Sequence, residues 1–313
     1  MCSSKHSGNP YAAQCINSIT AASVVERSWS PDHALQICQG VDDTNFLGPF
    51  ECMIHQKTTQ ITNDVVAELC QGALNAGPVE CFLDAPSILS EYHKARLCRR
   101  SAYSLPAKCA NYIATNIMRE ISSNQIVELC QSSISPIPTD GVGPAYCLDK
   151  VYRSVSISLA VSLCKDATSS ATHQCFIENR SLLKHESDRA FMCNRAPERN
   201  EISSCLKEAP ILLPDNTKSR LCKGSISQAS GTCARLLWQK SDCNSFVPHI
   251  SCAKNEEIIV EFCNSAESIA SALCFVNAPE ELSFRETADL CKDQADNIEL
   301  NNHIPGASKL RVG

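Results

Sequence analysis

The chain lacks any long apolar run. No stretch approaches the roughly 18 to 20 consecutive apolar residues of a membrane-spanning helix, so the sequence predicts no transmembrane segment. The first ten residues, MCSSKHSGNP, contain no apolar core, so no secretory signal peptide is visible.

A basic stripe is also absent. Acidic and basic residues are interspersed along the 313 residues, and the formal net charge is −6. This balance argues against nucleic acid or an anionic membrane surface as the main partner. Apolar residues make up 43% and charged residues 20%, a composition that can bury a core and is not that of a disordered chain.

No Cys-x-x-Cys motif occurs, although the chain has 21 cysteines. Zinc knuckles and thioredoxin-type redox centres both rely on closely spaced cysteines, so neither is expected. We expect no metal ion and no cofactor. His185-Glu186 begins like a zinc-protease helix, but Arg189 stands where that motif needs histidine.

The abundant cysteines are the dominant feature of the sequence. Regular spacing at this density predicts a disulfide framework, which requires the extracellular space or the lumen of the secretory pathway. The alternative is reduced cysteine acting as a small buried apolar residue in a cytosolic helical array. Cys2 already occupies the first position of a repeat with no helix ahead of it. We therefore expect the chain to be part of a longer precursor.

The cysteines follow a repeat that is clearest between Thr62 and Cys109. In this repeat, Thr or Ser lies eight before a first cysteine, and proline lies three before a second. The ten pairs are Cys2/Cys15, Cys38/Cys52, Cys70/Cys81, Cys98/Cys109, Cys130/Cys147, Cys164/Cys175, Cys193/Cys205, Cys222/Cys233, Cys243/Cys252 and Cys263/Cys274. Each unit begins near its first cysteine, and Cys291 opens a partial unit with no second cysteine. The mean period of about 28 to 29 residues is typical of solenoid repeats.

Each unit reads as a helical hairpin. Residues that cap helix starts stand eight before the first cysteine, at Ser30, Thr62, Ser90, Ser122, Ser156 and Ser283. They predict a first helix of about twelve residues. Prolines three before the second cysteine suit the first turn of a shorter second helix, at Pro49, Pro78, Pro106 and Pro144. The sequence thus predicts an all-α protein, a right-handed α-solenoid of about ten disulfide-pinned hairpins forming one array over residues 1–313.

Two regions depart from the regular unit. Residues 131–146 lengthen the turn inside a hairpin, which indicates a tip that tolerates insertion. Residues 233–263 are compressed instead, because the cysteines there lie closer together. We expect the first helix to lose a turn in this region and the curvature of the array to change there.

Two disulfide registers are compatible with the hairpin. We expect the first cysteine to lie about four residues before its helix ends, which places it level with the second cysteine of the same unit. The Cα atoms of the two cysteines can then come within the 4.4 to 6.8 Å that a disulfide needs. If each second cysteine were instead paired with the first cysteine of the next unit, the two cysteines would be offset by roughly 6 Å along the helix axis. We expect bonds within each unit, as paired above, and an unpaired Cys291.

The residues that could carry chemistry form no recognisable catalytic set. The eight histidines share no common position, and no nucleophile elbow or phosphate-binding loop is present. We therefore expect no catalytic residues and no enzyme. Asn179-Arg180-Ser181 is the only N-glycosylation sequon, and it lies where we expect an accessible helix end.

These features favour a non-enzymatic extracellular structural or adhesive protein. The array begins and ends at half-formed units, so neither end is expected to be capped, and head-to-tail contact with further copies would build a filament. The alternative is a monomeric secreted module whose extended face binds a protein or glycan ligand. The expected partners are the chain itself or an extracellular protein or glycan.

Overall fold

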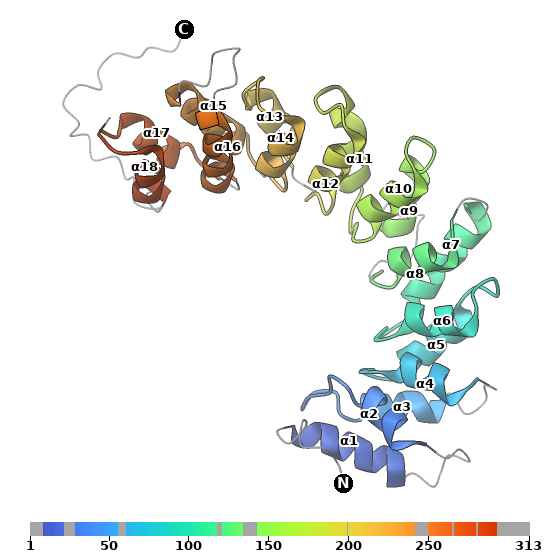
Figure 1. Cartoon of the computed structure of the whole chain (residues 1–313). Helices are drawn as coiled ribbons and strands as arrows, with labels where there is room; N and C mark the ends of the chain where they lie inside the picture. Colours follow the sequence, from blue (N-terminus) through green and yellow to red (C-terminus); the bar gives the residue numbers. More distant parts are fainter. Residues whose placement is uncertain are drawn as a thin grey trace. The chain divides into compact units, whose positions relative to one another are not determined.

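The computed structural model describes residues 9–21, 29–55, 61–117, 121–133, 143–198, 200–241, 250–264, 266–279 and 281–292, except for the side chains of 250–254 (Figure 1). All regular structure in these ranges is helical, with eighteen α-helices and no strand, which confirms the all-α class. None of the described helices combines the length and apolar character required to cross a membrane. The chain divides into two compact units, unit 1 (Met1–Gln174) and unit 2 (Cys175–Gly313).

Nine helices end at the first cysteine of a repeat, and we call them the cysteine-terminated helices. In unit 1 they are α2 (Pro31–Ile37, with Cys38 as its C-cap), α4 (Asn63–Cys70), α6 (Glu91–Cys98), α8 (Ser123–Cys130) and α10 (Ile157–Cys164). In unit 2 they are α12 (Glu186–Cys193), α14 (Asp215–Cys222), α16 (Ile250–Cys263) and α18 (Phe284–Cys291). All six predicted Ser and Thr residues stand at N-caps, and five of them accept a hydrogen bond from the backbone.

The predicted length of twelve residues for these helices is wrong, because most have eight. The prediction continued each helix past its cysteine. Instead, the residue two after the cysteine adopts a left-handed backbone in five cases, which ends a helix. These residues are Gly40, Gly72, Arg100, Arg195 and Gly224, with φ between 60° and 80°.

The other helices carry the second cysteine near their middle, and we call them the partner helices. They are α1 (Pro10–Ala21), α3 (Gly48–His55), α5 (Gly77–Asp84), α7 (Leu105–Asn116), α9 (Pro144–Val151), α11 (Ala171–Glu178), α13 (Ile202–Glu208), α15 (Ala229–Lys240) and α17 (Ala270–Asn277). The four predicted prolines occupy the first or second position of their helices, as expected. The division between the two units falls within α11.

Helices of the same kind pack on one another in sequence order. In unit 1 the cysteine-terminated helices make contacts from α2 through α4, α6 and α8 to α10, and the partner helices from α1 through α3, α5 and α7 to α9. In unit 2 the contacts run from α12 through α14 and α16 to α18, and from α13 through α15 to α17. Each unit thus contains two rows of helices.

In the described part of the chain, nine disulfides tie partner helices to cysteine-terminated helices. They are Cys15–Cys38, Cys52–Cys70, Cys81–Cys98, Cys109–Cys130, Cys147–Cys164, Cys175–Cys193, Cys205–Cys222, Cys233–Cys263 and Cys274–Cys291. Each bond joins a partner helix to the cysteine-terminated helix that follows it. The Cα atoms of Cys81 and Cys98, for example, are 5.5 Å apart.

The predicted pairing of the two cysteines within each repeat is therefore wrong. The pairs that fail are Cys2/Cys15, Cys38/Cys52, Cys70/Cys81, Cys98/Cys109, Cys130/Cys147, Cys164/Cys175, Cys193/Cys205, Cys222/Cys233 and Cys263/Cys274, and Cys291 is bonded to Cys274 rather than unpaired. The predicted pair Cys243/Cys252 stays a prediction, because Cys243 and the side chain of Cys252 lie outside the described part of the chain, as does Cys2.

Two structural facts explain the error. Each cysteine-terminated helix ends at its cysteine, so that cysteine is not level with the second cysteine of the same repeat. After α5 the chain continues beyond the helix end before it turns back. Behind α5, Leu89 N–H donates to the Pro86 carbonyl at 3.1 Å, and this turn takes up the stagger that argued against the observed register.

The compressed region around residues 233–263 also differs from the expectation. It contains one disulfide-linked pair of helices, α15 and α16. The helix that ends at Cys263 has fourteen residues and includes Cys252, so the predicted loss of a turn is wrong. The predicted change of curvature there stays a prediction, as does the single array over residues 1–313.

Candidate functional surface on the cysteine-terminated helices

Side chains at three positions of the cysteine-terminated helices make contacts with the neighbouring helix of the row. They lie six before, two before and one after the cysteine, on one helix face because they are spaced by four and three residues. We call the side chains at these positions the ladder. Where these side chains contact one another, they join one hairpin to the next.

Charges of opposite sign meet in the ladder of unit 1. Arg99, one after its cysteine, donates to Glu68, two before the cysteine of the preceding helix in the row, at 3.2 Å. Lys165 and Glu128 repeat this pairing with an N–O distance of 3.6 Å. Exposed pairs of this kind contribute only about 0 to 1 kcal/mol each to the free energy of unfolding. Their repetition instead favours one register between neighbouring hairpins.

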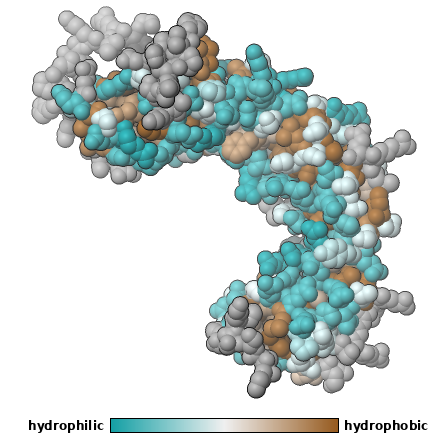
Figure 2. Space-filling model, in the orientation of Figure 1, coloured by the Kyte–Doolittle hydropathy of each residue, from teal (hydrophilic) through white to brown (hydrophobic). Residues whose placement is uncertain are grey.

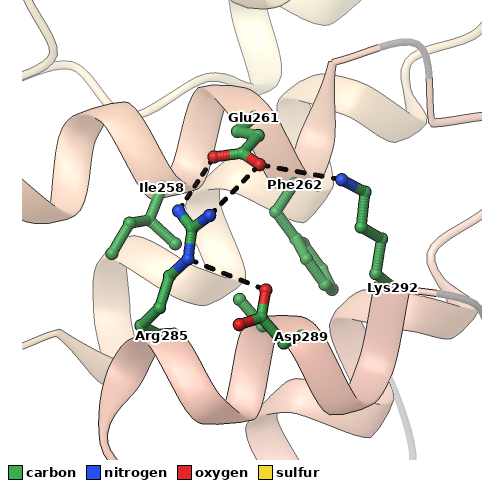
Figure 3. Close-up of a pocket in the computed structure, with 7 residues that line it drawn as sticks. Ile258, Glu261, Phe262, Arg285, Asp289 and Lys292 are labelled. Atoms are coloured by element: carbon green, nitrogen blue, oxygen red, sulfur yellow. Dashed lines mark hydrogen bonds and ion pairs between the residues drawn. The ribbon is translucent and has the colours of Figure 1, made fainter.

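Unit 2 carries the densest part of the ladder. Glu261 on α16 accepts from Arg285 at 2.9 Å and lies 3.7 Å from Lys292, and Arg285 also contacts Asp289 at 3.6 Å (Figure 3). Hydrogen bonding from Arg285 lowers the pKa of the Glu261 carboxyl, and Glu261 in turn raises the pKa of Arg285. The cluster is self-neutralising, with its charged groups directed at one another.

A groove of about 470 Å³ adjoins this cluster in unit 2. It is lined by residues of α12, α14 and α16, by Lys223 just after α14 and by Asn264 just after α16; the lining residues are Phe191, Arg220, Lys223, Glu257, Val260, Glu261 and Asn264. The Lys223 ammonium lies 3.8 Å from the centre of the Phe191 ring, and the Arg220 guanidinium bonds both oxygens of Glu257 at 2.8 Å. Figure 2 shows that apolar residues on the visible face lie in separate patches among hydrophilic ones.

The structure brings one Ser, His and Asp together at the start of the row in unit 1. The Ser30 hydroxyl lies 2.8 Å from His33 Nδ1, and His33 Nε2 lies 2.8 Å from Asp64 Oδ1. Ser30 also accepts the backbone N–H of His33 at 3.2 Å, so its oxygen caps α2. The same arrangement recurs as Ser90, His93 and Asn124, without a carboxylate. These contacts cap helices and link neighbouring hairpins.

His33 and His93 therefore share a position, five before the cysteine, and the expectation that no histidines do so is wrong. The sequence contained the signal, because both stand three after a capping serine. In the described part of the chain, no three His, Cys, Asp or Glu side chains gather closely enough to hold a metal ion.

Asn179 does not lie at an accessible helix end as predicted. It begins the short 3₁₀ helix η4 (Asn179–Ser181) and is 0% exposed. Its amide donates to the Cys175 carbonyl at 2.9 Å, and its carbonyl oxygen accepts from the Ser203 hydroxyl at 2.9 Å. The side chain thus links η4 to α13, and a glycan on it would be incompatible with this packing.

Comparison of the chain with models of protein families, with curated proteins and with solved structures finds no match.

Proposed function

We propose that the chain is a non-enzymatic extracellular scaffold. In this proposal its hairpins form an α-solenoid, and its ladder surface binds a partner protein. The disulfides support the extracellular or secretory compartment, because bonds of this number persist where the environment is oxidising. Extended faces of stacked helical repeats commonly serve as binding surfaces.

The observation that carries this proposal is the groove of about 470 Å³ beside Phe191. Elsewhere the described ladder side chains two before the cysteine are polar, whereas Phe191 is apolar and 47% exposed. Exposed aromatic residues beside basic ones are typical anchors of protein interfaces. A surface that served only to hold the hairpins together would not need an aromatic ring at this position.

The second candidate is end-to-end assembly into a filament, the structural or adhesive role. It is supported by the close packing of successive hairpins, because the end of a further copy could pack on this chain in the same way. A Cβ atom added at Gly48 would overlap the Ala73 carbonyl, and one added at Gly77 would overlap the Ala102 carbonyl. The predicted half-formed unit at Cys291 no longer supports this role, because Cys291 is bonded to Cys274.

Sedimentation equilibrium of the disulfide-bonded chain distinguishes the two candidates. We expect a single species near the monomer mass of 34.1 kDa over a wide range of protein concentration. A mass that rises continuously with concentration would favour the filament instead, because a head-to-tail contact that does not close has no fixed stoichiometry. The reduced chain is not a suitable sample for this comparison, since its hairpins lack their covalent links.

A further inference from the structure

One ladder base lacks the acid that its counterparts have. Arg99, Lys165 and Lys292 each follow a cysteine and contact Glu68, Glu128 and Glu261, respectively. Lys223 occupies the same position after α14, but Phe191 stands where the others have glutamate. Within the described ranges, no carboxylate pairs with Lys223. The repeat itself thus identifies an unmatched positive charge.

The acids of the groove are already engaged. Glu257 is held by both terminal nitrogens of Arg220, and Glu261 is held by Arg285 and Lys292. Hydrogen bonding from Arg220 lowers the pKa of the Glu257 carboxyl, so this acid remains ionised and paired. Across the groove and the adjoining cluster, four bases face three acids; these are Arg220, Lys223, Arg285 and Lys292 against Glu257, Glu261 and Asp289.

The groove offers apolar surface next to this charge. Phe191 is 47% exposed with Lys223 over its ring, and Val260 lies in the lining. A cation over an exposed aromatic ring is held weakly, and the donors of its ammonium stay available. An incoming carboxylate can therefore bond Lys223 without displacing it from the ring, while an apolar neighbour covers the ring edge.

We propose that this groove binds an acidic segment of a partner protein, with a Glu or Asp carboxylate on Lys223 and an adjacent apolar side chain against Phe191. This inference rests on the proposed binding function and names the chemistry of its partner. The unmatched Lys223 ammonium favours an acidic ligand, because both acids of the groove are already paired with other bases, and the ring favours a ligand with an apolar residue beside the acid. The partner carboxylate takes the place that Glu68, Glu128 and Glu261 occupy elsewhere in the ladder.

Fluorescence anisotropy with labelled peptides tests the proposal on the full disulfide-bonded chain. The probe is a fluorescein-labelled peptide that repeats Glu-Leu-Gly-Ser, and the comparison peptides repeat Gln-Leu-Gly-Ser and Glu-Ala-Gly-Ser. We expect the Glu-Leu probe to bind at least about tenfold more tightly than either comparison peptide. We also expect its affinity to fall as salt is raised, because the Lys223 contact is exposed to solvent.

Three variants locate the binding. Lys223→Gln should weaken binding of the probe by about tenfold or more. Lys165→Gln removes an equivalent base that already has its acid, so it is the matched control and should bind like the wild type. Phe191→Glu should weaken binding to a similar extent while retaining the fold, because it supplies Lys223 with the glutamate that the other ladder bases have. Circular dichroism checks that the fold is retained.

Several results would overturn the proposal. Equal binding of the Glu and Gln peptides would do so, as would wild-type binding by Lys223→Gln or by Phe191→Glu. Self-association of the wild type that Lys223→Gln abolishes would identify a second copy as the occupant, against a separate protein partner. Failure of the probe to bind a chain that sediments as a monomer overturns this inference alone, whereas polymerisation of the chain overturns the proposed function.

Discussion

His173 is a buried titratable residue of unit 1. The side chain lies on α11 and is 7% exposed, and its ring centre is 5.3 Å from that of Tyr146. Its Nδ1 atom has no hydrogen-bond partner among the described residues. Burial lowers the pKa of His173, and the nearby Lys150 ammonium lowers it further. The folded chain therefore favours the neutral imidazole.

We expect the stability of the native chain to fall as pH drops from about 7.5 to about 5.5. In the unfolded chain His173 binds a proton near its ordinary pKa of about 6.5, whereas in the folded chain its pKa is lower. The free energy of unfolding therefore begins to decrease as pH falls through about 6.5. Urea denaturation at each pH measures the effect, and His173→Gln should reduce the slope. His93→Gln is the control from the same unit. An unchanged slope in His173→Gln would contradict the assignment to this ring.

At this scale, the sequence was most informative where the chemistry is local. Ser122 and Ser283 are N-caps because their hydroxyls bond backbone groups three residues away, and such bonds depend on neighbours in the sequence. Asn179 was misjudged because its exposure depends on Ser203 and α13, which the sequon itself does not reveal. The sequence also did not reveal that Lys223 lacks an acidic partner. This conclusion depends on the contact between Lys223, just after α14, and Phe191 on the neighbouring helix α12.

At the scale of elements, glycine sets how closely one hairpin approaches the next. Gly77 opens α5, and a Cβ there would overlap the backbone carbonyl of Ala102. Alanine is normally favoured over glycine in a helix by about 0.5 to 1 kcal/mol, because it restricts the unfolded chain. At Gly77 the collision outweighs this gain, since a backbone carbonyl cannot move aside as a flexible side chain can.

We expect Gly77→Ala to lower the free energy of unfolding by about 1 to 3 kcal/mol, the usual cost of overpacking. Gly224→Ala is the matched comparison: no atom lies near its would-be Cβ, but its φ of +72° disfavours alanine. That variant should cost about 1 to 2 kcal/mol through the backbone alone. Urea denaturation of the disulfide-bonded variants measures both changes. A Gly77→Ala chain as stable as the wild type would refute the close approach.

The error in disulfide register also belongs to this scale. The sequence predicted hairpins of one long and one short helix, and the cysteine spacing then favoured bonds within the repeat. The period and the helix starts are correct because capping residues and prolines mark them directly. The helix ends were not predictable, because Arg100 and Arg195 take the same left-handed backbone as Gly40 and Gly72, and arginine does not mark that backbone in a sequence. A shift of about four residues at these ends was enough to change every bond.

At the scale of the whole molecule, stability comes from contacts between neighbours in sequence order. Each described disulfide closes a segment of between 17 and 30 residues. A bond closing about this length contributes on the order of 3 kcal/mol in the chain-entropy model. A helical hairpin of roughly 30 residues has too small a core to be stable alone. The bonds and the packing between hairpins are therefore both required.

We expect this dependence to appear when the chain is reduced. Every cysteine of the nine described disulfides except Cys274 is at most 5% exposed, so mild reductant in native buffer should break few bonds. Reductant in urea should break them all, and after the urea is removed with reductant still present the helical circular dichroism should not return. The same urea cycle without reductant is the control and should restore it. A reduced chain that refolds cooperatively would contradict the structural role of the disulfides, and would instead favour cysteine as a buried apolar residue in a cytosolic protein.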